Sequence, residues 1–293
     1  MTVAVRSTER APAFVEDILV CPLCKSALEY SPAMLRCFGC GTTFPQSRSD
    51  CYELLPPRND DDQLSWRARQ ESMEIWYREM VSTDWAPDCF ENDYGPLHLL
   101  LSRYRGTVLD LGGGAGITAR YLDRETQYIS VDPSLMWLAD EWTPFAGAPS
   151  VEKRAFVRGT GETLPIASGS VDVVLALWSM NHVGSPESIF DEVWRVLRPG
   201  GHFLVVPEDM EPRWSDLPAC LRSRHGWPGV ARDVRAKLRA ALPGGQWPLQ
   251  PDHLRIREAD LRRWAGTRFA LERRAWIGDY LTVEYTKRQD RER

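Results

Sequence analysis

The sequence lacks any apolar run that approaches the ~20 residues needed to cross a membrane. Its mean hydropathy is negative. Residues 1–16 are mixed and charged, without the apolar core of a secretory signal peptide. These absences argue against a membrane protein, and we expect a cytoplasmic one.

The number of cysteines is odd, whereas a disulfide framework would need an even number. The chain has seven cysteines in 293 residues, and four of them form one closely spaced pattern. Metal thiolates in a reducing compartment explain this better than disulfides. Cys51, Cys89 and Cys220 are left over, and we expect ordinary buried thiols. The length allows a main domain of about 150–200 residues plus one or two small modules.

Charge is unevenly distributed. The net charge is −5, yet residues 211–293 carry 18 Lys and Arg against 11 Asp and Glu. A basic C-terminal third can face an anionic substrate or RNA. Such arginines are more often the solvated face of a helix, and both interpretations stay open here.

Four cysteines near the N-terminus follow the spacing C-x2-C-x12-C-x2-C: Cys21, Cys24, Cys37 and Cys40. Two short knuckles would each supply two thiolates, as a tetrahedral zinc site requires. The pattern resembles a zinc ribbon. Since all four ligand positions are filled by protein, we expect the zinc to be structural.

The segments around these cysteines support a small module. Residues 28–30 and 34–36 predict a hairpin, and residues 42–45 and 52–56 predict an edge strand. The polar, acidic stretch 56–62 reads as a linker.

The centre of the chain carries a glycine-rich loop. The apolar run 107–111 ends in three glycines at alternate positions, Gly112, Gly114 and Gly116, and a helical pattern follows. This predicts a buried strand that turns into a helix N-terminus, where backbone N–H groups point at a ligand. Asp110 precedes the first glycine by two residues, so the spacing differs from the dinucleotide fingerprint G-x-G-x-x-G.

This D-x-G-x-G-x-G pattern resembles motif I of the class I S-adenosylmethionine (SAM)-dependent methyltransferases. The resemblance implies that Asp110 and the three glycines bind SAM. About 20 residues later, the predicted strand 128–132 ends in Asp132, where a carboxylate can accept both ribose hydroxyls of an adenosine. Met136 follows at the start of the next expected helix and is predicted to lie against the adenine ring.

The segment 156–165 resembles the next element of the ubiquinone-biosynthesis type (type 11) of methyltransferases. That family usually has an acid where this chain has Thr160, followed by a small residue, here Gly161, and a glutamate, here Glu162. Because a threonine loses the charge-assisted contact to the adenine amino group, we expect weaker recognition of the adenine.

The next segments complete the resemblance. Residues 170–177 form an apolar run typical of a central parallel strand, followed by Trp178 and His182 at its carboxyl end, where ligands of α/β folds bind. The string V-W-R-V-L-R-P-G-G-H-F ends an amphipathic helix at 189–197 and begins a strand at 202–207. We therefore expect an α/β fold with a doubly wound, Rossmann-like methyltransferase sheet.

We divide the chain into three parts. Residues 1–58 form the zinc-ribbon module, residues 59–106 a helical linker that covers the cofactor, and residues 107–293 the SAM-dependent methyltransferase domain. The linker is expected to hold helices at 63–80 and 96–104. Within it, Tyr94 and His98 are candidates to reach a substrate.

Residues 208–250 are too long for a simple connection and are predicted to be a lid insertion over the substrate. They include a helix at 230–242, and Trp214 and Trp227 are candidate contacts to the substrate. A helix at 257–264 and closing strands at 269–273 and 280–286 follow.

The predicted function is methyl transfer from SAM to a small-molecule acceptor of secondary metabolism, such as antibiotic biosynthesis. Trp178 and the lid would bind the acceptor, and His182 is the candidate catalytic base or orienting group. The alternative is a ribosomal RNA guanine-N1 methyltransferase, because bacterial members also place a zinc ribbon before this core. Cys40, in place of their usual His, departs from that family. A non-catalytic SAM-binding regulatory protein is a third hypothesis.

Overall fold

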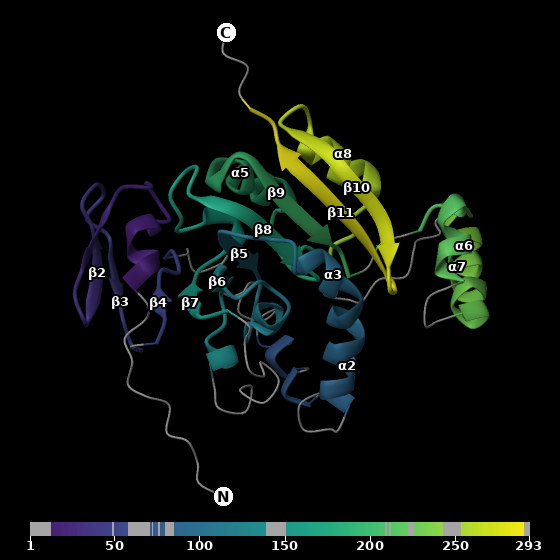
Figure 1. Ribbon diagram of the computed structural model, residues 1–293, viewed down its shortest axis with the longest axis horizontal. Helices are drawn as coiled ribbons and strands as arrows, with labels where there is room; N and C mark the ends of the chain where they lie inside the picture. The colour runs from purple at the N-terminus through teal and green to yellow at the C-terminus, as the bar shows by residue number, and fades with distance from the viewer. Residues whose placement is uncertain are drawn as a thin grey trace, which may run out of the picture.

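A computed structural model of the chain describes residues 13–48, 50–57, 71, 73–75, 77–79, 85–138, 151–208, 210, 212–221, 226–242 and 253–289. Its centre is a sheet of eight strands (Figure 1). The strands of this sheet are β4 (Tyr52–Glu53), β5 (Thr107–Leu111), β6 (Gln127–Asp132), β7 (Lys153–Arg158), β8 (Val171–Leu177), β9 (Leu197–Val206), β10 (Phe269–Ile277) and β11 (Tyr280–Lys287).

The strand order is β10-β11-β9-β8-β5-β6-β7-β4. Strands β4 to β9 pair in parallel, and β11 pairs antiparallel with both β9 and β10. From β5 the chain runs outward through β6 and β7 and then returns to place β8 on the other side of β5. This confirms the expected doubly wound α/β fold, with its switch point between β5 and β8, where such sheets bind ligands at their carboxyl ends.

Helices cover the sheet and extend beyond it (Figure 1). The α-helices are α2 (Trp85–Tyr94), α3 (His98–Leu101), α5 (Pro186–Val196), α6 (Leu217–Cys220), α7 (Gly226–Ala240) and α8 (Glu258–Ala265). The 3₁₀ helices are η1 (Ala13–Ile18), η2 (Gly95–Leu97), η3 (Ile117–Arg120), η4 (Met136–Leu138), η6 (Gly161–Thr163) and η7 (Trp214–Asp216).

Helix α5 illustrates how the sequence sets an element's limits. Ser185 caps its N-terminus by accepting a hydrogen bond from the backbone N–H of Ser188, and Pro186 occupies the first turn, where a missing N–H costs nothing. The helix buries Ile189, Phe190, Val193 and Val196 against the sheet and ends where β9 begins. The helix predicted at 189–197 is therefore present and begins three residues earlier.

A second, three-stranded sheet forms the N-terminal module, at the left of Figure 1. It consists of β1 (Leu28–Tyr30), β2 (Met34–Cys37) and β3 (Thr43–Pro45), and β1 and β2 form the expected hairpin. Strand β4 lies within the predicted ribbon module, yet it pairs with β7 in the main sheet. The N-terminal module thus contributes the edge strand of the main sheet.

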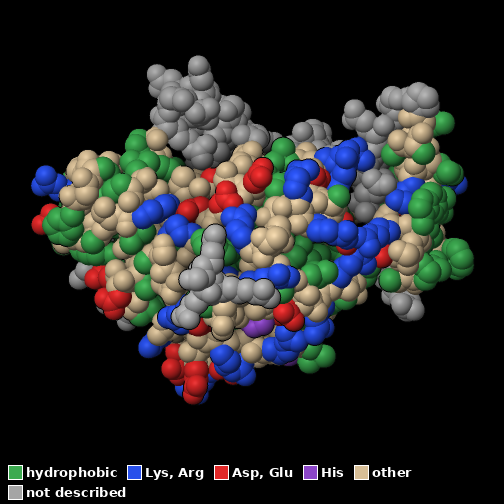
Figure 2. Space-filling view, turned by 90° about the horizontal axis from the view of Figure 1, so that it is seen from above, with side chains coloured by type: hydrophobic (Ala, Val, Ile, Leu, Met, Phe, Trp, Pro, Cys, Tyr) green, Lys and Arg blue, Asp and Glu red, His purple; other side chains and the backbone are tan. Residues whose placement is uncertain are grey.

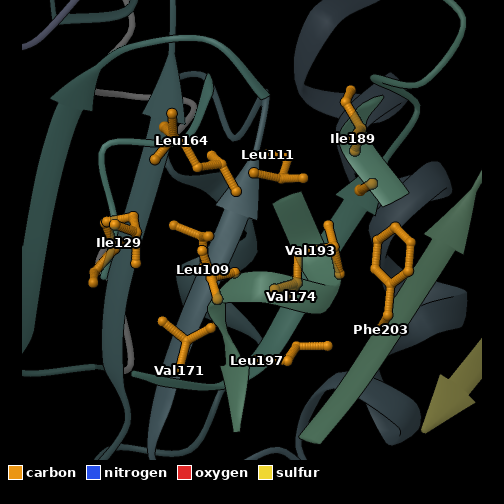
Figure 3. Close-up of a cluster of buried hydrophobic side chains, with 14 of the residues drawn as sticks. Leu109, Leu111, Ile129, Leu164, Val171, Val174, Ile189, Val193, Leu197 and Phe203 are labelled. Atoms are coloured by element: carbon orange, nitrogen blue, oxygen red, sulfur yellow. The ribbon is translucent and has the colours of Figure 1, made fainter. Parts of the chain in front are cut away.

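The same continuity holds for the apolar core. Figure 3 shows Leu109, Ile129, Val174 and Phe203 side by side across the sheet, on the neighbouring strands β5, β6, β8 and β9. All four are fully buried, and they belong to one cluster that also contains Leu35 of the ribbon. The ribbon packs on the core as a continuation of it.

The glycine loop is followed by the short 3₁₀ helix η3 instead of the predicted α-helix. Likewise, Asp132 is followed by η4, another 3₁₀ helix, within the described residues. Of the helix predicted at 63–80, residues 71, 73–75 and 77–79 are helical, and the other positions lie outside the described residues. The helix predicted at 96–104 is present only as η2 and α3, and α2 precedes it.

The C-terminal elements match the prediction more closely. Helices α7 and α8 and strands β10 and β11 occur where the sequence predicts them, with β11 antiparallel to β9. Helices α6 and α7 lie at the end of the molecule opposite the ribbon (Figure 1). No helix among the described residues is long and apolar enough to cross a membrane.

Candidate functional site

A cavity of about 210 Å³ opens at the carboxyl ends of the central strands. Its walls come from the glycine loop, the end of β6, the segment before η6, the end of β8 and the region around α2. The lining residues are Met73, Tyr77, Phe90, Asp93, Tyr94, Leu111, Gly112, Gly113, Gly114, Ala115, Ile117, Val131, Asp132, Pro133, Trp137, Gly159, Thr160, Gly161, Glu162, Leu177, Trp178, Ser179, His182, Val183, Gly184, Ile189, Glu208 and Tyr280.

The glycine loop forms one wall because its backbone adopts a conformation that side chains oppose. Gly112 and Gly114 have φ angles of 68° and 51°, in the left-handed region. A Cβ on Gly112 would lie 2.6 Å from the Cβ of Ser179, and one on Gly114 would lie 3.2 Å from the Trp137 ring. Both glycines line the cavity, so the bare backbone faces whatever binds there.

Asp132 lies beside this loop at the end of β6. Its Oδ2 accepts a hydrogen bond from the backbone N–H of Gly114 at 3.3 Å, and its Oδ1 accepts one from the N–H of Ser134 at 2.8 Å. Burial raises the pKa of the Asp132 carboxyl to about 7. The carboxylate lines the cavity, as expected for a group that binds ribose hydroxyls.

Asp110, another predicted cofactor contact, lies beneath the glycine loop. It is 1% exposed and does not line the cavity, and it accepts a hydrogen bond from the hydroxyl of Tyr128 at 2.8 Å. A Cβ on Gly113 would lie 2.9 Å from its carboxyl, which places Asp110 directly beneath the loop. Burial raises the pKa of Asp110 to about 6. The side chain supports the loop from below.

Two other predicted cofactor contacts lie away from the cavity. Gly116 faces the rings of Phe156 and Tyr128, and Met136 is buried beside Ala115 and Trp137. Neither residue lines the cavity, whereas Trp137 does. The reason is geometric: in a 3₁₀ helix, adjacent side chains point about 120° apart, so the neighbour of Met136 is the one that reaches the wall.

Thr160, Gly161 and Glu162 follow β7, next to Asp132, and all three line the cavity. The hydroxyl of Thr160 lies 3.0 Å from that of Thr163. Glu162 Oε1 accepts a hydrogen bond from the backbone N–H of Gly184 at 2.7 Å. Glu162 thereby joins this wall to the loop that leads from β8 into α5.

Aromatic side chains form the other end of the cavity. The ring of Trp178 meets those of Tyr94 and Tyr280 edge to face, with centroids 4.8 and 5.2 Å away. Trp178 has a φ of 58°, an uncommon conformation for a bulky residue. Its indole N–H is buried and has no hydrogen-bond partner among the described residues. A strained backbone and an unpaired donor at a cavity wall are features of binding sites.

His182 lies at the mouth of the cavity in a cluster with two other residues. Its Nε2 lies 3.0 Å from Oε2 of Glu208, and Nε2 of His253 lies 3.5 Å from the same oxygen. The two imidazole rings meet edge to face with centroids 4.5 Å apart. His98, in contrast, is exposed beside Tyr121 and does not line the cavity.

The two tryptophans predicted to contact a substrate do not line the cavity. Trp214 and Trp227 are 57% and 74% exposed. Trp214 lies under the ammonium of Lys237, whose nitrogen is 5.3 Å from the ring centroid. Both belong to the region of η7, α6 and α7, which extends away from the sheet (Figure 1). That 208–250 acts as a lid remains a prediction.

The four cysteines of the N-terminal pattern do converge. The thiols of Cys21, Cys24, Cys37 and Cys40 all lie within 4.8 Å of one another. Cys24 and Cys37 are 3.3 Å apart, and Cys21 and Cys40 are 3.7 Å apart. Thiolates bound to one tetrahedral zinc ion at ~2.3 Å lie about 3.8 Å apart, so the donor set fits zinc.

Of the remaining cysteines, Cys51 is buried as expected, and the side chains of Cys89 and Cys220 lie outside the described residues.

Sequence reasoning missed several residues of the site. Trp137, Glu208, His253 and Tyr280 come from separate parts of the chain and meet only in the fold. One signal was available for Glu208, since it follows the apolar run 203–206 at the carboxyl end of a predicted strand. No local pattern marks His253 or Tyr280.

Comparison with known proteins agrees with this arrangement. Residues 109–205 match the sequence profile of the family described as "Methyltransferase domain". Residues 109–205 thus resemble a methyltransferase domain. An uncharacterized methyltransferase of Mycolicibacterium gilvum is 42% identical over 98 residues, which are 32% of this chain and 36% of that protein. One from Mycobacterium tuberculosis (strain ATCC 25177 / H37Ra) is 39% identical over 101 residues, or 34% and 37%. The chain spans about a third of the length of these relatives.

Among solved structures, 1,6-didemethyltoxoflavin-N1-methyltransferase of Burkholderia thailandensis superposes with a TM-score of 0.50. The alignment covers 89% of this chain and 99% of that one at 16% identity. The fold is the Rossmann-like methyltransferase fold.

Proposed function

We propose that this protein transfers a methyl group from SAM to a small-molecule acceptor. The observation that carries the proposal is the cavity at the switch point of the sheet, where the bare glycine loop and the carboxylate of Asp132 face the same space. SAM, when bound, supplies a methyl group already activated on a sulfonium. The protein then has to hold the acceptor atom in line with the C–S bond of the methyl group and to remove the proton of the acceptor.

The residues of the cavity suit the parts of SAM. Each carboxylate oxygen of Asp132 accepts one hydrogen bond from a backbone N–H, which leaves acceptor capacity for a ribose hydroxyl. Trp137 offers an aromatic surface for the adenine, and Thr160 offers one hydroxyl near it in place of the family's acid. We therefore expect SAM to bind, with a less firmly held adenine than in relatives that carry the acid.

The opposite end suits the acceptor. Tyr94, Trp178 and Tyr280 form an aromatic wall, and the unpaired indole N–H of Trp178 can donate a hydrogen bond to a polar atom of the acceptor. His182 and Glu208 stand beside this wall at hydrogen-bond distance from each other. In this proposal they orient the acceptor or take its proton.

The four cysteines are proposed to hold a structural zinc ion. Four thiolates fill a tetrahedral site, so no position stays open for chemistry. The ribbon also supports the core, because Nζ of Lys25, in the first knuckle, lies 2.8 Å from a carboxylate oxygen of Glu192 on α5.

The alternative acceptor, ribosomal RNA, has less support. Figure 2 shows Lys and Arg side chains interspersed with Asp and Glu on the upper face of the molecule. Arginines of α8, of β10 and of the turn between them are paired: Arg263 with Asp260, Arg268 with Asp191, Arg273 with Glu284, and Arg274 with Asp216 and Glu258. RNA binding needs clustered cations available to phosphates. A solvated, ion-paired face fits these contacts better.

The test is activity with methyl-labelled SAM, offered side by side with ribosomal RNA and with a small-metabolite extract. We expect label in the small-molecule fraction, and none when Asp132 is replaced by alanine. Label in RNA would favour the alternative. SAM binding without transfer to either fraction would favour a non-catalytic, regulatory protein.

A further inference from the structure

We propose that His182, Glu208 and His253 form a binding site for a divalent transition-metal ion at the wall of the cavity. One ligand atom of each residue lies within 4.8 Å of the other two. Both imidazole Nε2 atoms lie close to the same carboxylate oxygen, Oε2 of Glu208. The distance is 3.0 Å for His182 and 3.5 Å for His253. Ligands at ~2.1 Å from one metal ion lie roughly 3.0–3.5 Å apart at octahedral to tetrahedral angles, so these separations suit an ion.

The three ligands belong to three separate loops that a fourth residue holds together. Asn181 is fully buried, and its Oδ1 accepts a hydrogen bond from the backbone N–H of Glu208 at 2.9 Å. Its Nδ2 donates to the carbonyl of Leu254 at 3.0 Å, and its own carbonyl accepts from the N–H of Leu254 at 2.7 Å. Asn181 precedes His182, and Leu254 follows His253. The ligand set is therefore fixed by backbone contacts before any ion binds.

The position of the cluster leaves coordination sites facing the cavity. His182 and Glu208 line the cavity, whereas the side chain of His253 is 1% exposed and lies behind them. Trp178 and Ser179 line the same wall. Three protein ligands leave at least one position open, which is the mark of a reactive site. The cysteine cluster, with four protein ligands, has none.

The donor atoms define which ions suit the site. Two imidazole nitrogens and one carboxylate oxygen favour Zn²⁺, Fe²⁺ or Co²⁺ over Mg²⁺ and Ca²⁺, which prefer oxygen ligands alone. The proposed role rests on the proposed function. With the ion bound, His182 and Glu208 would orient the acceptor through the ion and would not take its proton themselves. An acceptor hydroxyl bound to the ion would lose its proton to solvent, and the ionised oxygen would then attack the methyl group. The O–C bond forms as the C–S bond of SAM breaks, and S-adenosylhomocysteine leaves.

Metal binding is measured on the full chain without SAM or acceptor. The protein is stripped with a chelator and dialysed against Co²⁺ or Zn²⁺, and bound metal is counted by elemental analysis. We expect two equivalents in the wild type and one in Cys37→Ser. His182→Gln, Glu208→Gln and His253→Gln should also bind one equivalent, and their affinity for the second should fall at least tenfold. His98→Gln, which replaces a histidine outside the cluster, should bind two.

The absorption of the Co²⁺ protein separates the two sites, because only the cysteine site gives thiolate charge-transfer bands. Those bands should persist in the three cluster variants and vanish in Cys37→Ser. Circular dichroism shows which variants are folded. Because His253 is buried, His182→Gln and Glu208→Gln carry the test if the His253 variant does not fold.

A single equivalent in the wild type, or a second equivalent that the cluster variants retain, would overturn the site. Methyl transfer that proceeds at full rate when only the cysteine site is loaded would overturn its catalytic role. Two equivalents without any methyl transfer would instead contradict the proposed function and leave the metal site standing.

Discussion

The carboxylate of Asp132 accepts a hydrogen bond from the backbone N–H of Gly114 at 3.3 Å, so the end of the second parallel strand holds the glycine loop of the first. The same carboxylate lines the cavity. One side chain thus connects the shape of the loop to the position at which a ribose would be recognised.

Replacing Asp132 with asparagine should therefore weaken SAM binding more than it weakens the fold. A hydrogen bond to a charged group contributes about 1.5–3 kcal/mol, so its loss predicts a roughly 10- to 100-fold rise in the Kd for SAM. Calorimetric titration with SAM checks this. Asp123→Asn is the matched control, because Asp123 pairs with Arg105 at the surface, away from the cavity. An unchanged Kd in Asp132→Asn would refute the assignment.

Cys37→Ser should remove the zinc and also loosen the cofactor site. The ribbon contacts the segment after Thr160 and Glu162 through backbone hydrogen bonds: Val20 N–H donates to Pro165 O at 3.0 Å, and Ala167 N–H donates to Ile18 O at 2.7 Å. Because zinc contributes on the order of 10 kcal/mol to folding such a module, its loss should unfold the ribbon and release this segment. Zinc content, melting temperature and SAM affinity should all fall.

The control for this variant is Cys51→Ala, which changes a buried cysteine outside the cluster and should keep about one zinc at the cysteine site. If Cys37→Ser keeps its zinc, the tetrathiolate assignment is wrong. If it loses zinc but binds SAM as tightly as before, the ribbon does not support the cavity.

Asp110 should make the stability of the ligand-free protein depend on pH. Burial raises its pKa to about 6, above the ~3.9 of an unfolded chain. The folded state therefore holds this proton more tightly, and the associated stability is present below about pH 4 and is lost as the pH rises through 6. The change amounts to roughly 2–3 kcal/mol.

Urea unfolding of the wild type and of Asp110→Asn at pH 4.5 and pH 7.5, without SAM, tests this. The wild type should lose more free energy of unfolding than the variant between the two pH values. An equal loss in both proteins would show that Asp110 does not titrate in this range.

The sequence predicted the central strands because a parallel strand buried on both faces reads as a continuous apolar run, as in 107–111 and 170–177. It predicted that Asp132 ends a strand and that the four cysteines lie together, because each depends on spacing within one short segment. The burial of Asp110 could not be predicted, for the same local reason. Residues of a strand alternate between faces, and the pattern did not say that this carboxyl lies under the loop.

The sequence could not predict contacts between distant segments. Tyr280 reaches the cavity only because β11 pairs with β9, and His253 reaches Glu208 only because Asn181 bonds to Leu254. Conversely, the aromatic content around Trp214 suggested a substrate contact, but that residue is exposed and outside the cavity. The composition of a segment shows how many apolar side chains it has, but it does not show where those side chains lie in the folded protein.

Trp178→Phe should stabilise the protein and impair its function. The indole N–H is buried without a partner among the described residues, and an unpaired buried donor costs about 1–3 kcal/mol. Phenylalanine keeps an aromatic ring between Tyr94 and Tyr280 and removes that donor. The free energy of unfolding should therefore rise by about 1 kcal/mol, while kcat/KM for the acceptor falls about tenfold and the Kd for SAM stays unchanged.

Tyr104→Phe, which removes a hydroxyl bonded to Glu284 outside the cavity, is the control variant. It should lose stability without a change in kcat/KM for the acceptor. Should Trp178→Phe lose stability and keep full activity, the N–H is a structural donor and the acceptor is recognised elsewhere.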